Sequence, residues 1–112
     1  MNDQPLAPVV DRRDDRGHYA ILVGGEQAGL TAFADRGDQR VFYHTEIGDQ
    51  FARLGLAKQL VAEALSDTRA HHKRIVAVCP YVAKFLKQTD EYTAATDPVT
   101  PDILQWLGHR LP

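Results

Sequence analysis

The stretch that decides the fold runs from Arg40 to Tyr81 and reads RVFYHTEIGDQFARLGLAKQLVAEALSDTRAHHKRIVAVCPY. Side chains alternate in character over Arg40 to Ile47, which is typical of a strand. Apolar residues then recur at helical spacing from about Gly55 to about His72. The β-branched run Ile75 to Cys79 predicts a short buried strand. A strand, a helix and a second strand predict parallel pairing through a right-handed crossover.

Alternation along the first of these strands predicts two faces. It places Val41, Tyr43, Thr45 and Ile47 on one face and Phe42, His44 and Glu46 on the other.

Toward the N-terminus, short turns connect two further strands. His18 to Val23 is an apolar run, and Gly24-Gly25 supplies the two positive-φ positions of a tight hairpin. Gln27 to Ala34 is the returning strand, and Asp35 to Asp38 predicts a second turn. Three antiparallel strands in a meander follow from these two turns.

Toward the C-terminus, the chain predicts helices. Tyr81 to Gln88 can form a helix after Pro80 ends the preceding strand. Asp90 to Pro101 is expected to be a loop, and Asp102 to Leu107 a short terminal helix. The predicted fold is α/β (α+β), a mixed sheet in β-β-β-α-β-α order with a short C-terminal helix.

Length and composition predict one ordinary globular domain. The chain has 112 residues and a net charge of −2. We expect a flexible segment at residues 1–16 and a single domain at 17–112. The small net charge argues against nucleic acid and membrane partners, and no apolar run has the length of a membrane span. A single cysteine, Cys79, and the lack of a signal-peptide core predict a cytoplasmic protein.

The loop before the long helix is predicted to bind phosphate. It runs from Gly48 to Ala57, and the helix behind it presents unpaired N–H groups with a partial positive charge. Gly55 and Ala57 let a ligand approach the backbone, while Arg53 and Lys58 add charge. The alternative is that Gly55 merely begins a helix. The spacing matches neither a Walker loop nor a dinucleotide fingerprint.

Three segments together resemble the small stand-alone proteins of the GNAT superfamily of N-acetyltransferases. These segments are His44-Thr45-Glu46-Ile47, Gly55 to Val61, and Cys79-Pro80-Tyr81-Val82. The resemblance covers the chain from Tyr19 to about Tyr92. It implies a GNAT core that binds acetyl-coenzyme A, with the pantetheine along Thr45 to Ile47 and the pyrophosphate on the amides of Arg53 to Lys58.

The sequence departs from the superfamily pattern in two ways. Ala52 stands where the general motif has Gln or Arg three residues before the first glycine. The pair of helices that larger members insert after the first strand is also missing. Pyrophosphate binding is therefore expected to rely mainly on backbone amides, and the acceptor side is expected to be open.

Acetyl transfer to an amine needs a base for the amine proton and stabilisation of the leaving thiolate. Glu46 and His44 lie on one strand face and can share this role, although a solvated or salt-bridged Glu46 and a structural His44 are open alternatives. Tyr81, or Tyr92, is a candidate acid for the leaving thiolate. Backbone N–H groups near Ile47 are candidates for the oxyanion.

Cys79 ends the predicted strand at the place expected for the thioester. A thiolate there can accept the acetyl group and pass it on, although a free cysteine is often a small buried apolar residue. Lys84 and Lys87 can contact the adenosine phosphate or lie on a solvated face. The adjacent His71 and His72 do not converge on a helix, so no metal site is expected.

The binding set expected for acetyl-coenzyme A is therefore drawn from three elements. It comprises Thr45, Ile47, Arg53, Leu54, Gly55, Leu56, Ala57, Lys58, Cys79 and Lys84. The catalytic candidates are Cys79, Glu46, His44 and Tyr81.

The sequence predicts an N-acetyltransferase acting on an amine of a protein or small molecule. The alternatives are a coenzyme A-binding module or sensor with little or no turnover, and an interaction domain that has lost the cofactor. The expected oligomeric state is a monomer or weak homodimer.

Overall fold

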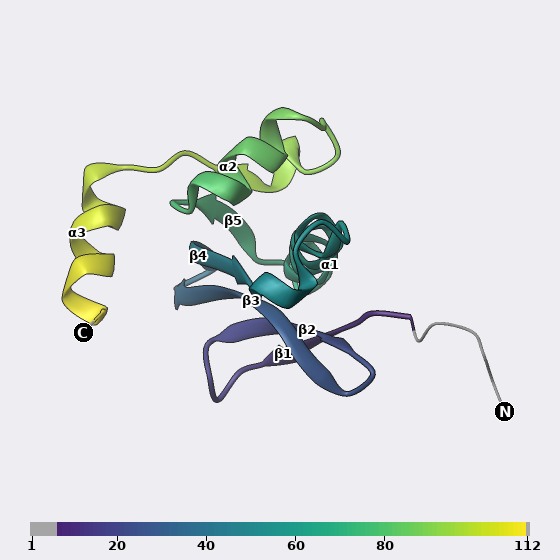
Figure 1. Cartoon of the computed structure of the whole chain (residues 1–112). Coiled ribbons are helices and arrows are strands. Elements are labelled where there is room, and N and C mark those ends of the chain that lie inside the picture. Colours follow the sequence, from purple (N-terminus) through teal and green to yellow (C-terminus); the bar gives the residue numbers. More distant parts are fainter. Residues whose placement is uncertain (1–6, 112) are drawn as a thin grey trace, which may run out of the picture.

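A six-stranded mixed sheet forms the centre of the protein, and the computed structural model describes residues 7–111 of it (Figure 1). The strands lie in chain order and are β1 (Val9–Arg13), β2 (His18–Val23), β3 (Glu26–Arg36), β4 (Gln39–Ile47), β5 (Arg74–Ala77) and β6 (Thr96–Asp97). The helices are α1 (Leu56–Ala70), α2 (Pro80–Lys87) and α3 (Pro101–Arg110), with short 3₁₀ turns η1 (Asp49–Phe51) and η2 (Thr93–Ala95).

The pairing follows the predicted topology. β2, β3 and β4 form an antiparallel meander, and β4 pairs with β5 in parallel across the α1 crossover. Gly24, Gly25 and Gly37 adopt positive φ in the two hairpin turns, as expected. The predicted mixed α/β fold is confirmed. All three α-helices of residues 7–111 follow β4, so no helix joins the early strands.

Three predicted boundaries are corrected. The segment expected to be flexible includes β1, since Val9–Arg13 pairs with β2 along its whole length; residues 1–6 lie outside the described part. The region expected to be a loop contains η2 and β6, and β6 pairs with β5. The terminal helix begins at Pro101, because the Thr100 side chain accepts a hydrogen bond from the backbone N–H of Ile103 as its N-cap. The helix ends at Arg110.

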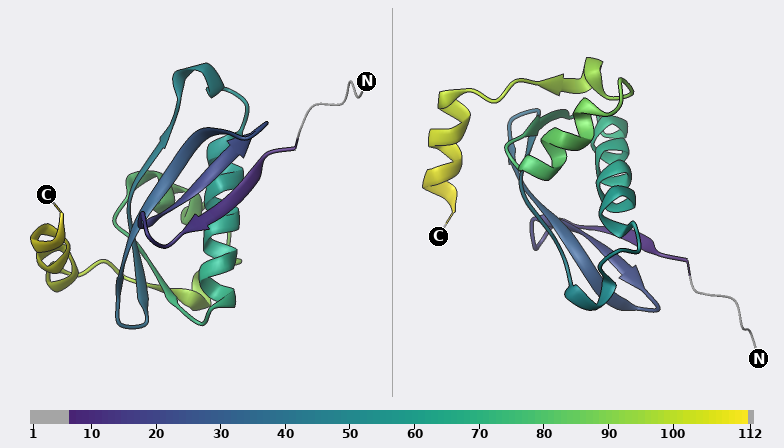
Figure 2. Two further views of the ribbon diagram at one scale, coloured as in Figure 1. Left: turned by 90° about the horizontal axis from the view of Figure 1, so that it is seen from below. Right: turned by 45° about the horizontal axis from the view of Figure 1, so that its top comes forward.

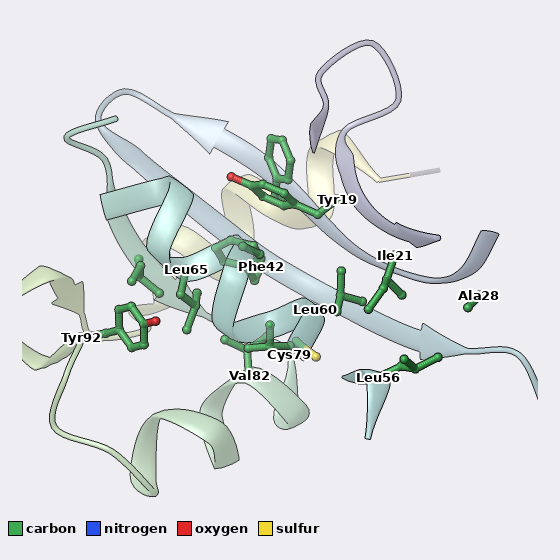
Figure 3. Close-up of a cluster of buried hydrophobic side chains, with 14 residues drawn as sticks. Tyr19, Ile21, Ala28, Phe42, Leu56, Leu60, Leu65, Cys79, Val82 and Tyr92 are labelled. Atoms are coloured by element: carbon green, nitrogen blue, oxygen red, sulfur yellow. The ribbon is translucent and has the colours of Figure 1, made fainter. Parts of the chain in front are cut away.

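Helix α1 forms where the apolar spacing predicts it and buries one face on the sheet. Its buried residues are Leu56, Leu60, Val61, Ala64, Leu65 and Thr68. The apolar members pack with Tyr19, Ile21 and Phe42 of the strands and Val82 of α2, and Figure 3 shows this cluster between the helices and the sheet. Burial of such side chains contributes about 2 kcal/mol each.

Helix α3 covers the other face of the sheet. Ile103 and Leu107 pack against Val41 of β4 and Val76 of β5. Both views of Figure 2 show α3 and α1 on opposite sides of the sheet. Within residues 7–111, no helix combines the length and apolar character that a membrane crossing requires.

A partly buried polar network ties the start of the sheet to α1. The Arg40 guanidinium donates to Asp35 (2.8 Å) and to the Tyr19 hydroxyl (2.7 Å). The Tyr19 hydroxyl donates to Asp67 on α1 (2.6 Å), and Arg12 of β1 also donates to Asp67 (2.9 Å). Arg12 thereby helps to hold β1 in the sheet although its sequence lacks an apolar pattern.

Candidate active site

Strands β4 and β5 separate at Phe42. The last parallel pair is Phe42 with Ala77, and the Phe42 carbonyl accepts the N–H groups of both Val78 (2.9 Å) and Cys79 (2.8 Å). Beyond this point, β4 residues 43–47 have no β5 partner in the described structure. The backbone edge of β4 is therefore available to a ligand.

A β-bulge in β4 changes which side chains face this opening. Ala32 pairs with His44 and Phe33 with Phe42, so Tyr43 is the extra residue. The strict alternation of side chains predicted for this strand is therefore wrong beyond Tyr43. Thr45 and Ile47 share the α1 side of the sheet with Phe42, whereas His44 and Glu46 are on the opposite side with Tyr43 and Val41.

Cys79 lies at the opening and contacts β4. It is 3% exposed, and its sulfur is 3.3 Å from the Thr45 hydroxyl oxygen. Thr45 is in turn 2.9 Å from the hydroxyl of Thr31 on β3, a side chain that is fully buried. A sulfur and two hydroxyls thus form one hydrogen-bonded row where the two strands part.

His44 and Glu46 form an exposed pair on the α3 side of β4. Their side chains are 56% and 61% exposed, and His44 Nε2 lies 3.2 Å from Glu46 Oε1. The sequence correctly placed them on one face. The structure places that face opposite the one that carries Thr45, so the pair approaches the opening from the other side of the sheet.

The loop before α1 presents a row of free backbone donors. In the described chain, the N–H groups of residues 53–58 make no backbone hydrogen bond, and the first bond of α1 runs from Gln59 N–H to the Gly55 carbonyl. Arg53 and Gly55 have φ of 70° and 72°, and such alternation can turn successive N–H groups toward one point. Ala52, Arg53, Leu54 and Gly55 are exposed. This arrangement is suited to an anion.

Two lysines flank a cavity between α1 and α2. The cavity has a volume of 180 Å³ and is lined by Lys58, Tyr81, Lys84, Phe85 and Gln88. Lys58 is in the first turn of α1, so the cavity adjoins the free N–H groups. Lys87, also on α2, is not among the lining residues. Lys84, which belongs to the binding set expected from the sequence, therefore lines the cavity, whereas Lys87, which that set leaves out, does not.

Other candidates have structural partners. The Tyr92 hydroxyl donates to the Ala62 carbonyl (3.1 Å) and lies 2.7 Å from Ser66 Oγ, so both contacts are with α1. His71 binds the Asp67 carbonyl through Nδ1 (2.9 Å). Among residues 7–111, no group of three or more His, Cys, Asp or Glu side chains is arranged to hold a metal ion.

Thr31 contacts the candidate site, and the sequence pattern did not predict it. A threonine in a strand looks like an ordinary β-branched residue, and only its pairing with Thr45 brings it next to Cys79. One feature of the sequence could have indicated it: a threonine stands in the middle of the strand that is predicted to lie beside the His-Thr-Glu strand.

Comparisons with known proteins agree with this architecture. Residues 18–95 match the sequence profile of the GCN5-related N-acetyltransferase family. A GCN5-like protein from Staphylococcus aureus, solved by NMR, superposes with a TM-score of 0.62 at 15% identity, over 83% of this chain and 91% of its own. An aminoglycoside acetyltransferase from an uncultured soil metagenomic sample, solved with sisomicin, superposes with a TM-score of 0.50 at 13% identity, over 74% of this chain and 60% of its own.

No curated protein matches the sequence significantly. The fold and the profile nevertheless define the class: the chain belongs to the GCN5-related N-acetyltransferase family. By family it is an acyltransferase, as the sequence predicted.

Proposed function

We propose that the protein is an acetyl-coenzyme A-dependent N-acetyltransferase. The observation that carries the proposal is the row of free N–H groups at residues 53–58, which lies beside the place where β4 and β5 part. The pyrophosphate binds these amides, and the pantetheine pairs with the free edge of β4 along Thr45 to Ile47. The backbone N–H groups of the loop supply the pyrophosphate contacts that the side chain of Ala52 cannot make.

The charged groups around the loop support an anionic ligand with several phosphates. Lys58 and Lys84 line the cavity next to the free amides, and Tyr81 also lines it. Leu56 and Ala57 contribute backbone rather than side chains, since Leu56 is buried in the core. We assign the two lysines to the phosphates of coenzyme A.

The thioester then lies near Cys79, at the end of the pantetheine path. Glu46 and His44 take the proton of an amine that approaches from the side of the sheet on which both are exposed, directly or through water. The exposure of both side chains favours an acceptor group carried on a larger molecule, such as a lysine or N-terminus of a protein. Tyr81 is the proposed acid for the leaving thiolate.

Binding is tested by comparing two variants on the same helix. Lys84→Gln removes a charge that lines the cavity, and Lys87→Gln removes the same charge from outside the lining. In calorimetric titrations with acetyl-coenzyme A, Lys84→Gln should weaken binding about three- to tenfold, because it removes a charge-assisted contact at a partly exposed site. Lys87→Gln should bind like wild type. No binding to wild-type protein at millimolar ligand would sink the proposal.

Turnover separates an enzyme from a binding module or sensor. Wild type and Cys79→Ala are incubated with acetyl-coenzyme A and a panel of amines, and acetylation is followed by intact mass. Binding without acetylation of any amine would favour the module. A protein label that is absent in Cys79→Ala and is passed to an amine would assign the acetyl carrier role to Cys79.

The proposal also covers the cellular compartment and the oligomeric state of the protein. A single free cysteine suits a reducing compartment, so we place the protein in the cytoplasm. We propose a monomer or weak homodimer in solution, which light scattering over a concentration series would test.

A further inference from the structure

A further cavity lies on the sheet beside Glu46. It has a volume of 190 Å³ and is lined by residues of β3, by Glu46 of β4 and by the glycine that follows β4; the lining residues are Gln27, Ala28, Gly29, Leu30, Glu46 and Gly48. Leu30 pairs with Glu46 in the antiparallel register, so their side chains stand together on one side of the sheet. This is the side on which His44 and Glu46 are exposed, so the cavity adjoins the candidate base.

The charge of this cavity is negative. Among the described residues that line it, Glu46 alone is charged. Glu46 Oε1 lies 3.2 Å from His44 Nε2, whereas Glu46 Oε2 has no side-chain partner within the described chain. Glu26 and Asp49, both exposed, are next in sequence to two of the lining residues and add two carboxylates. The cavity between α1 and α2 is flanked by lysines instead, so the two cavities favour ligand groups of opposite charge.

The volume limits what the cavity can hold. Pockets that enclose a whole small molecule have volumes of roughly 300–1,000 Å³, and this cavity has 190 Å³. At about 30 Å³ for each water-sized group, it has room for about six such groups. The four carbons and the nitrogen of a lysine side chain fit this space. The amine of a protein N-terminus stands on a branched carbon and would have to bring the peptide backbone in with it.

Leu30 provides an apolar surface for such a carbon chain. It is half-buried and belongs to neither hydrophobic cluster of the described residues, so its exposed part is free to contact a ligand. β3 and β4 lie about 4.8 Å apart, as neighbouring strands do. A carbon chain that lies over Leu30 therefore brings its nitrogen to Glu46, on the strand whose other edge borders the opening between β4 and β5.

We infer that this cavity is the acceptor subsite and that Leu30 is a specificity-determining residue for an unbranched alkylammonium group, such as a lysine side chain. Leu30 contacts the carbon chain, and Glu46 binds the nitrogen. The inference rests on the proposed function and narrows its acceptor from any amine of a protein to a side-chain amine.

A titration of wild-type protein tests the subsite without acetyl-coenzyme A. Backbone amide signals are followed by NMR while Nα-acetyl-lysine methylamide is added. The signals of Gly29, Leu30 and Gly48 should shift, and those of Gly24 and Gly25, which line another cavity, should not. Alanine methylamide, whose amine is on a branched carbon, should bind about tenfold more weakly. Putrescine should also bind at the cavity, and tighter binding than that of the lysine probe would identify a polyamine as the source of the group.

Two leucine variants test the role of Leu30 in turnover. Leu22 is the matched control, because it is also half-buried, belongs to neither cluster and lines a different cavity. Leu30→Gln should lower kcat/KM for the lysine probe about tenfold through a higher KM, and should change KM for acetyl-coenzyme A less than about twofold. Leu22→Gln should behave like wild type. If Leu30→Gln does not fold, the titration of wild type still decides whether the cavity binds the amine.

Three results would overturn the inference. They are shifts by the lysine probe that map away from the cavity, alanine methylamide that binds as tightly as the lysine probe, and equal kinetic effects of Leu30→Gln and Leu22→Gln. Failure of wild type to bind acetyl-coenzyme A would refute the proposed function. Acetylation of the lysine probe by a protein whose cavity signals do not shift would refute the subsite alone.

Discussion

Gly55 provides the sharpest test of the phosphate loop, because Gly37 is a matched control. Both glycines are exposed, both have positive φ (72° and 59°), and a Cβ added at either would meet no atom within 4 Å. Alanine at each position therefore introduces the same backbone strain and no clash. Gly55 precedes α1 beside the free amides, whereas Gly37 is in the turn between β3 and β4.

The magnitude follows from the left-handed conformation. An alanine there costs roughly 1–2 kcal/mol, and the stiffer unfolded chain returns about 0.4–1 kcal/mol. Both variants should thus lose about 1 kcal/mol of unfolding free energy, or about 4 °C in Tm for a chain of this size. Calorimetric melting measures this loss, which should be similar for the two if the Gly55→Ala loop keeps its conformation and smaller for Gly55→Ala if that loop relaxes.

Ligand binding should separate the two variants. If the loop of Gly55→Ala relaxes out of the left-handed region, acetyl-coenzyme A must restore the strained form, and roughly 1–2 kcal/mol corresponds to a Kd raised about 5- to 30-fold. Gly37→Ala should keep Kd within about twofold. If Gly55→Ala loses less stability than Gly37→Ala, its loop has relaxed, and equal Kd values for the two variants would then show that the loop amides do not hold the ligand.

Three further predictions concern packing and pH. Gly29→Ala should cost about 2 kcal/mol in urea unfolding, because its Cβ would lie 2.5 Å from the Glu46 carbonyl oxygen; an unchanged midpoint would contradict this approach of β3 to β4. Burial alone would raise the pKa of Asp67, but hydrogen bonds from Tyr19 and Arg12 outweigh it and lower the pKa. The resulting stability is present above the unfolded pKa of about 3.9 and lost as pH falls below it, so Asp67→Asn should flatten the acid limb of a stability profile. Burial, and then the hydrogen bond to Asp67, raises the pKa of Tyr19 to about 12. Tyr19 should therefore give a late ionisation step in an ultraviolet titration, with stability lost as pH rises from about 10 toward that value, and Tyr19→Phe should abolish this step.

The regular elements were predictable because their patterns are local. The spacing of Leu56, Leu60 and Val61 predicted α1, and the glycine pair at 24–25 predicted the first hairpin. β1 was missed because Val9–Arg13 has no apolar alternation. It is a strand because β2 offers a free edge and Arg12 reaches Asp67, and neither fact is visible in the local sequence.

The sequence predicted which residues form the candidate site, but it did not predict on which face of the sheet each of them lies. The motif residues were found, but one bulge at Tyr43 moved Thr45 to the α1 side of the sheet and His44 to the other. A bulge depends on the register of two strands, so alternation along one strand does not reveal it. The same register brings Thr31 to Thr45.

The strand-loop-helix-strand stretch from Arg40 to Tyr81 was determined by the sequence itself, because hydrophobic periodicity and glycine positions act over a few residues. Tertiary structure alone decided that β4 and β5 part at Phe42, and that Cys79 lies at the opening against Thr45. These features depend on contacts between segments more than 30 residues apart, such as the 34-residue separation of Thr45 and Cys79, which packing of the whole sheet and its helices fixes.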